Sequence, residues 1–137
     1  MADAGAGHGH GHGHGRDALV RARVLVHAAM TDPQGGGAAL VQAESLLLAA
    51  LAAAPDDAAL LTGLGAVQCD LGRYADAVDA LQRAVRLQPE DRHTYFNLGV
   101  ALLNSGDDAQ AMQRFRQAAT RAGSAATWEA YFDPQAQ

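Results

Sequence analysis

The chain has 137 residues and a mass of 14.2 kDa, which suits a single small domain. Hydrophobic residues make up 49% of the chain, which excludes global disorder, and aromatic residues only 5%, which favours an all-α protein over a sheet. The formal net charge is -5 and the ten cations are all arginines scattered among acids. Nucleic acid and anionic membranes are therefore not expected as partners.

The first fifteen residues are almost entirely Gly, Ala and His, and they predict a disordered tail over 1–15 ahead of a helical domain over 16–137. The tail lacks the basic start and apolar run of a secretory signal. The longest apolar run, 46–54, is far shorter than the roughly 20 residues that a bilayer requires. The single cysteine, Cys69, excludes an internal disulfide. We therefore expect a cytoplasmic setting.

Four histidines of the tail alternate with glycine: His8, His10, His12 and His14. Neutral imidazoles on a flexible chain can converge on nickel, copper or zinc. Because histidine must lose its proton to bind a metal, such binding is expected to fade below about pH 6. The pattern is equally typical of a purification aid or of neutral low-complexity sequence, and these alternatives stay open. No other cofactor is expected.

After the tail, apolar periodicity predicts helices over 16–30 and 38–53. Pro33 and the three glycines at 35–37 lie between them, which predicts a loop over 31–37.

From residue 57 onward the sequence repeats itself at a spacing of 34 residues. The matching positions are Leu61, Leu64, Gly65, Gly72, Ala77, Leu81 and Ala84 in one unit and Tyr95, Leu98, Gly99, Gly106, Ala111, Phe115 and Ala118 in the next. Apolar residues recur every three or four positions, which indicates amphipathic helices. The predicted helices are 57–70, 74–87, 92–104 and 108–122.

Particular residues predict where these helices start and stop. Gly72 and Gly106 stand where a helix ends in a left-handed residue, a conformation that glycine adopts without steric cost. Asp91 precedes one helix, and Asp107 with Gln110 has the spacing of a capping box.

Two glycines fall inside the predicted helices, where glycine costs about 1 kcal/mol relative to alanine. Gly65 and Gly99 lie on the apolar face of their helices, and close approach to the second helix of each unit would explain them. The small residues expected opposite them are Ala77, Ala84, Ala111 and Ala118.

These residues resemble the tetratricopeptide repeat, whose pattern includes Leu-Gly in the first helix, alanines in the second and a closing proline. The full units are 58–91 and 92–125, and a degenerate unit over 24–57 precedes them. Gln68 replaces an apolar residue of the pattern, and Gly123 replaces the closing proline. The resemblance implies a right-handed α-solenoid of about three helical hairpins that binds proteins or peptides on its concave face.

The resemblance places a peptide groove on the first helices: Thr62, Ala66, Cys69, His93, Phe96, Asn97, Val100, Leu103 and Asn104. Asn97 would hold a partner's backbone amide, while the apolar members would bury apolar side chains. A subclass of these repeats captures a C-terminal carboxylate with cations, and the corresponding positions here hold none. Alternatively, the apolar members contact a neighbouring helix or a second copy of the chain.

Three aromatic residues near the C-terminus, Trp128, Tyr131 and Phe132, have helical spacing. They predict a short final helix over 124–132, whose residues 126–132 cap the last hairpin. The alternative is that this segment folds into the groove of its own or another molecule, giving autoinhibition or a dimer.

No segment offers a paired nucleophile and base, a phosphate loop or paired carboxylates, so an enzyme is not expected. Cys69 has no nearby cation and is expected as an inert thiol, and His27 and His93 as structural or exposed residues. The sequence favours a non-enzymatic interaction module, an adaptor or chaperone-like protein that binds an apolar or amphipathic segment. The alternatives are a type III secretion-type chaperone, a metal-handling accessory protein that uses the histidine tail, and self-assembly into a homo-oligomer.

Overall fold

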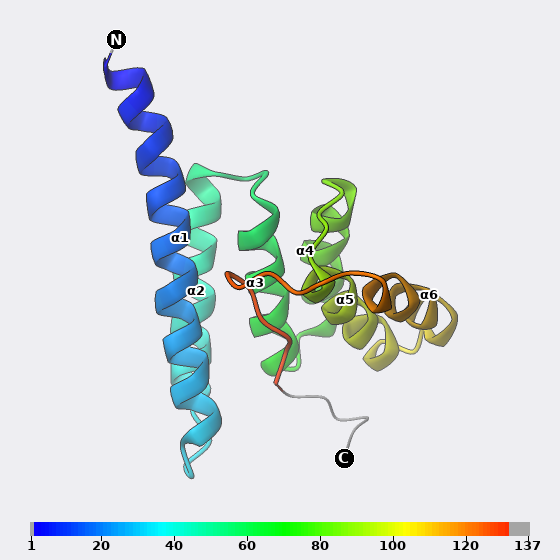
Figure 1. Ribbon diagram of the computed structural model, residues 1–137. Helices are drawn as coiled ribbons and strands as arrows, with labels where there is room; N and C mark the ends of the chain where they lie inside the picture. Colours follow the sequence, from blue (N-terminus) through cyan, green and yellow to red (C-terminus); the bar gives the residue numbers. More distant parts are fainter. Residues whose placement is uncertain (1, 132–137) are drawn as a thin grey trace.

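The computed structural model describes residues 2–131, with side chains from residue 14 onward. Consecutive helices pair into three hairpins that stack side by side (Figure 1). The helices are α1 (Ala2–Thr31), α2 (Gly37–Ala53), α3 (Ala58–Asp70), α4 (Tyr74–Arg86), α5 (Arg92–Asn104) and α6 (Asp108–Ala119). Over the described residues the fold is an all-α helical-repeat solenoid, as predicted.

The repeat spacing of the sequence is the spacing of the helices. α3 and α5 start at residues 58 and 92, and α4 and α6 start at 74 and 108, both pairs 34 residues apart. The predicted boundaries hold to within a residue except at the end of α6, which stops at Ala119 and not at residue 122. The chain turns away there because the carbonyl of Ala122 accepts a hydrogen bond from the backbone N–H of Arg92 at 3.0 Å. This bond returns the chain to the start of α5.

The turns inside the second and third hairpins contain the predicted left-handed glycines. Gly72 and Gly106 have φ of 77° and 89°. After Gly72 the backbone N–H of Arg73 donates to the carbonyl of Gln68 at 2.8 Å, which satisfies one of the last carbonyls of α3. An equivalent bond closes α5.

Aspartate side chains begin three of the helices. Asp57, Asp91 and Asp107 each accept a hydrogen bond from a backbone N–H in the first turn that follows. The side chain of Gln110 donates to the carboxylate of Asp107 at 2.7 Å and not to its backbone, so the predicted capping box forms with one altered bond.

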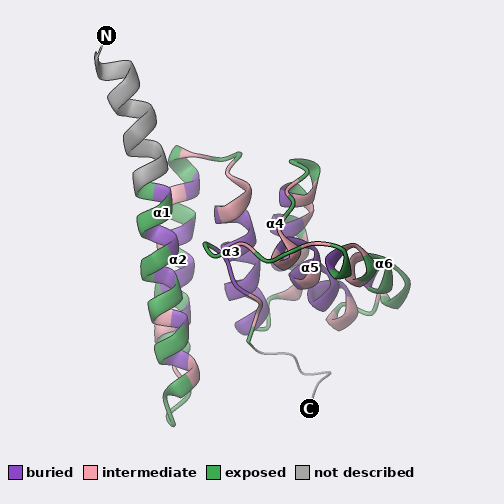
Figure 2. Cartoon of the chain, viewed as in Figure 1, coloured by how far each residue is buried: buried purple, intermediate pink, exposed green. Residues whose placement is uncertain are grey.

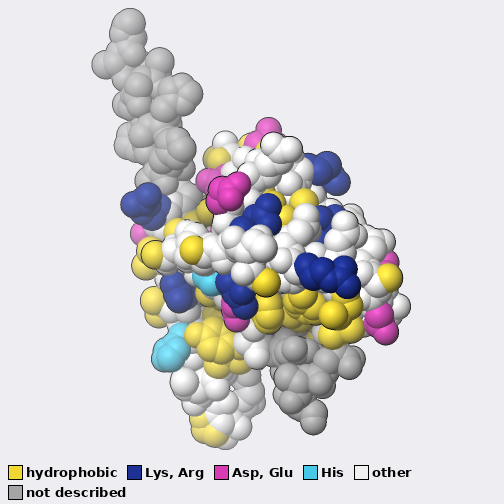
Figure 3. Space-filling view, turned by 45° about the vertical axis from the view of Figure 1, so that its right-hand side comes forward, with side chains coloured by type: hydrophobic (Ala, Val, Ile, Leu, Met, Phe, Trp, Pro, Cys, Tyr) yellow, Lys and Arg dark blue, Asp and Glu magenta, His cyan; other side chains and the backbone are white. Residues whose placement is uncertain are grey.

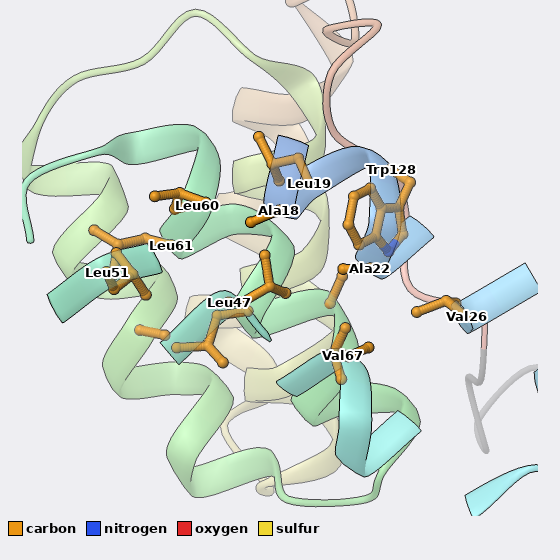
Figure 4. Close-up of a cluster of buried hydrophobic side chains, with 14 of the residues drawn as sticks. Ala18, Leu19, Ala22, Val26, Leu47, Leu51, Leu60, Leu61, Val67 and Trp128 are labelled. Atoms are coloured by element: carbon orange, nitrogen blue, oxygen red, sulfur yellow. The ribbon is translucent and has the colours of Figure 1, made fainter. Parts of the chain in front are cut away.

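The buried side chains form two clusters along the solenoid, on the faces that the hairpins turn toward one another (Figure 2). The first joins α1, α2 and α3, with Leu47, Leu60 and Leu61 fully buried in it (Figure 4). The second joins α4, α5 and α6 around Leu81 and Leu98. Among the described residues, no helix has both the length and the apolar character needed to cross a bilayer.

Two departures from the family pattern have structural explanations. Gln68 donates to Glu44 of α2 at 3.2 Å, and Arg73 donates to the same carboxylate at 2.6 Å. Glu44 is buried, so these bonds satisfy a charge between the first and second hairpins. Gly123 lies where the chain passes the imidazole of His93, and a β carbon there would lie 2.6 Å from Cε1 of that ring.

The expected boundary between a disordered tail and the first helix is not observed, because α1 starts at Ala2 and not at Arg16. The backbone of residues 2–15 continues the helix formed by the residues that follow. A residue added to the end of an existing helix gains a hydrogen bond without the cost of nucleation, which favours this continuation despite the glycines.

The predicted C-terminal helix is wrong for the described residues, since 124–131 contain a turn at 125–126 and no helix. Residues 126–132 therefore do not form a helical cap, and Phe132 lies outside the described residues. The physical reason is that backbone groups of this segment bond to side chains of α1 and α5 and not to one another.

Candidate peptide-binding groove

Residues 124–131, which we call the C-terminal strap, run back from α6 across the first helices of the three hairpins (Figure 1). On α1, Arg23 Nη1 donates to the carbonyl of Ala125 at 3.1 Å. On α3, a β carbon at Gly63 would lie 3.3 Å from Cη2 of Trp128. On α5, Asn97 bonds to the strap backbone. These contacts define a groove between α1, α3 and α5 that the strap occupies.

The side-chain amide of Asn97 pairs with the strap as one peptide group pairs with another. Its Nδ2 donates to the carbonyl of Trp128 at 2.9 Å, and its Oδ1 accepts from the backbone N–H of Ala130 at 2.9 Å. In an extended chain these two backbone groups flank residue 129 and point to the same side. The amide therefore recognises extended backbone irrespective of the side chains that it carries.

Trp128 fills a slot between α1 and α3. Its side chain is only 3% exposed and belongs to the first buried cluster, next to Leu19 and Ala22 of α1 (Figure 4). Gly63 leaves room for the ring, and the guanidinium of Arg23 lies 5.9 Å from the ring centroid. The slot therefore accepts a large flat side chain and places a cation beside it.

Asp91 holds the first part of the strap while it caps α5. Its carboxylate accepts from the backbone N–H of Ser124 at 2.9 Å and from the hydroxyl of Thr127. The same hydroxyl lies 2.8 Å from Nδ1 of His93, so Thr127 is buried between two polar side chains of the helix start. The N-cap residue of the third hairpin thus also belongs to the groove.

Arginines lie along the rim of the groove. Arg92 Nε lies 3.3 Å from Glu129 of the strap, with both side chains half-buried, and its guanidinium carbon is 5.6 Å from the ring centroid of Phe96. Arg121 lies 4.1 Å from the ring centroid of Tyr95. On the face seen in Figure 3, arginine side chains stand among apolar and acidic ones. Such half-exposed pairs orient a ligand more than they bind it.

The structure divides the nine predicted groove residues into two groups. Four are fully or almost fully buried: Thr62, Ala66, Cys69 and Val100. Thr62 Oγ1 lies 2.7 Å from Oγ1 of Thr94, which joins α3 to α5. These four residues fix the spacing of the helices that form the groove. The thiol of Cys69 is buried, as expected.

The other five groove residues lie on α5. His93 and Asn97 meet the strap directly. Phe96 packs against Phe115 with ring centroids 5.5 Å apart, and Leu103 and Asn104 are partly exposed beyond the strap. Their contact with a partner stays a prediction.

Sequence reasoning missed the groove roles of Arg23, Gly63 and Asp91. Arg23 belongs to α1, which has no repeat register to place it. Asp91 was recognised only as a helix cap, and nothing in its local sequence indicates a second role. The remaining histidine of the helical part, His27, is exposed, as expected.

The histidine tail lies largely outside the described side chains. His8, His10 and His12 fall there, and His14 is exposed. Within the part of the chain that the structure describes, no group of three or more His, Cys, Asp or Glu residues is arranged to hold a metal. Metal binding by the tail stays a prediction.

The sequence matches the tetratricopeptide repeat family over residues 42–85 and 68–127, which together exceed half of the chain. The chain therefore belongs to the tetratricopeptide repeat family. A segment of 58 residues is 43% identical to the peroxisomal targeting signal receptor of Candida albicans (strain SC5314 / ATCC MYA-2876). That match covers 42% of this chain and 10% of the relative, so the chain corresponds to about a tenth of that protein.

Solved structures with the same arrangement of helices include two of MamA. One crystal structure matches with a TM-score of 0.54 and 23% identity, over 61% of this chain and 53% of MamA. A substituted form of MamA matches with a TM-score of 0.52 and 20% identity, over 76% of this chain and 96% of that one. At this identity the likeness shows the fold.

Proposed function

We propose that this chain is a non-enzymatic interaction module, an adaptor or chaperone-like protein of the cytoplasm. It holds an extended apolar or amphipathic segment of another protein in the groove between α1, α3 and α5. The observation that carries this proposal is the pairing of Asn97 with two backbone groups of an extended segment. Backbone pairing supplies affinity for any extended chain, and the slot beside Gly63 supplies selectivity for one large side chain.

Membership of the family supports a protein-binding role. The relative from Candida albicans is, by its name, a receptor for a targeting signal, which is consistent with recognition of a short segment. The narrower roles considered from the sequence, a secretion-type chaperone and a metal-handling accessory protein, have no specific observation in their favour.

Selection from a display library of random peptides, as long as the strap, tests the proposed function. The library is selected in parallel on the full chain and on its Trp128→Ala variant, which vacates the slot. We expect enriched peptides to carry a large apolar or aromatic residue. We also expect their affinity to fall about tenfold or more when Asn97→Asp is introduced, because the aspartate cannot donate to a backbone carbonyl.

Met112→Glu is the matched control, since Met112 is exposed on α6 and away from the strap contacts. It should leave the affinities unchanged. Absence of enriched peptides on both proteins, or binding that is insensitive to Asn97→Asp in a folded variant, would contradict the proposal.

A specific observation also favours self-association as a second function. The outer face of the first hairpin leaves Val20 and Val24 of α1 58% and 64% exposed, with Val41 and Leu48 of α2 about half exposed. Val20, Val24 and Leu46 line a depression of about 330 Å³ on this face. The first hairpin is the end of the stack, so a second copy is the occupant that would cover this face.

Sedimentation velocity over a concentration series tests this self-association. We expect a dimer that dissociates on dilution and whose dissociation constant rises about tenfold or more in Val24→Glu, because a charge on the buried face must be desolvated. Val24→Thr, which keeps the shape of the side chain, should have a smaller effect. A chain that is monomeric at every concentration would contradict this second function.

A further inference from the structure

We infer that the C-terminal strap is an intramolecular ligand of the groove, which a partner segment must displace before it binds. This inference rests on the proposed function and adds the class of partner: an extended peptide with an aromatic residue followed by an acidic and then a small residue. The strap itself has this chemistry, with Trp128, Glu129 and Ala130 in sequence.

The strap is held as a ligand is held, by side chains of the helices acting on its backbone. Arg23 donates to one of its carbonyls, Asn97 engages a carbonyl and an N–H, and Asp91 accepts from a third backbone group. The groups that bind it are polar side chains that water can solvate once the strap leaves. Its departure therefore leaves no buried polar group stranded in the groove.

The helices keep their own core without the strap. Trp128 is the strap's one buried member of the first cluster, whose other buried members lie on α1 to α4. Ala130 only packs at the edge of the two clusters. Undocking of the strap thus exposes one indole and the groove floor, and the hairpins remain packed against one another.

The strap also fits the slot imperfectly. Nε1 of Trp128 is buried, and among the described residues it has no hydrogen-bond acceptor. A buried donor without a partner weakens the bound state relative to water. A partner whose aromatic residue lacks this N–H, such as phenylalanine, avoids that penalty and can replace the strap.

Charge on the rim selects the residue after the aromatic one. Glu129 of the strap lies 3.3 Å from Arg92, and Arg23 stands over the indole on the α1 side. Both rim charges are positive, so an acidic residue at this position of the partner is favoured and a basic one is disfavoured.

The short connection between α6 and the strap favours binding within one molecule. α6 ends at Ala119 and the strap begins at Ser124, so only residues 120–123 separate them. A tether of this length gives an effective concentration in the millimolar range, which a free partner must overcome. If the strap is docked about 90% of the time, the apparent affinity for a partner falls about tenfold.

Fluorine NMR on the full chain labelled with fluorotryptophan tests displacement, because Trp128 is the only tryptophan. The probe is the synthetic peptide of residues 124–131, acetylated, amidated and unlabelled, with the sequence SAATWEAY. We expect saturable conversion of the buried resonance into a solvent-exposed one as the probe replaces the strap. A control peptide with alanine in place of tryptophan should require a concentration about tenfold higher or more.

Anisotropy of the same peptide, now carrying a fluorophore, measures affinity directly. We expect Trp128→Ala, which disables the strap, to bind the probe about tenfold more tightly than the wild-type chain. Adding Asn97→Asp to that variant should remove the gain. If Trp128→Ala does not fold, displacement in the wild-type chain remains the deciding measurement.

Equal affinity of the probe for wild type and folded Trp128→Ala, or a fluorine resonance that the probe never shifts, would overturn the inference. Peptides from the display library that bind Trp128→Ala and wild type equally would overturn it too, while leaving the proposed function intact. A doubled mass in sedimentation, with the strap exchanged between two copies, would overturn the assignment to a single molecule.

Discussion

Gly65→Leu is expected to lower the free energy of unfolding by about 3 kcal/mol, the upper end of the range for an overfilled core. Even a β carbon at Gly65 would overlap the side chain of Leu81, lying 2.6 Å from its Cδ1. Leu81 is fully buried in the second cluster and has no free space to move into. Urea denaturation followed by circular dichroism measures the change.

Two other glycines serve as comparisons for Gly65. Gly99→Leu should cost less, because the β carbon would meet the ring of Phe115, which is partly exposed and can turn outward. Gly37→Ala should leave stability unchanged or raise it, since nothing lies within 4 Å of the position. A Gly65→Leu variant as stable as the wild type would contradict the close packing of α3 on α4.

Trp128→Ala is expected to lower the free energy of unfolding by about 3 kcal/mol. The substitution removes the indole that fills the slot between α1 and α3. The loss cannot exceed the free energy with which the strap docks, because the helices keep their own buried clusters. Urea denaturation should therefore show a lower midpoint, while the circular dichroism of the native state keeps its helical signal.

Tyr131→Ala is the matched control for Trp128→Ala. Tyr131 is an aromatic residue of the same strap but is 49% exposed, so the variant should remain within about 0.5 kcal/mol of the wild type. A Trp128→Ala variant as stable as Tyr131→Ala would contradict the anchoring of the strap by its indole.

The glycines inside the helices show how far local sequence reaches. The presence of glycine at positions 65 and 99 predicts close approach of two helices, and the structure has that approach. The residues met there are Leu81 and Phe115 and not the flanking alanines. Leu81 lies four residues after Ala77 and three before Ala84, so all three share one helix face, and spacing alone could not choose among them.

The sequence by itself determined the helices, their turns and their stacking from residue 58 onward. Hydrophobic period, left-handed glycines and the repeat of 34 residues act over one or two turns of chain, so they can be read without knowing the fold. Only the tertiary structure decided the course of residues 124–131. Their aromatic spacing favoured a helix, but Arg23 and Asn97, distant in sequence, offer their backbone groups better partners. Long-range bonds to the backbone replaced the local ones, and the predicted cap became the occupant of the groove.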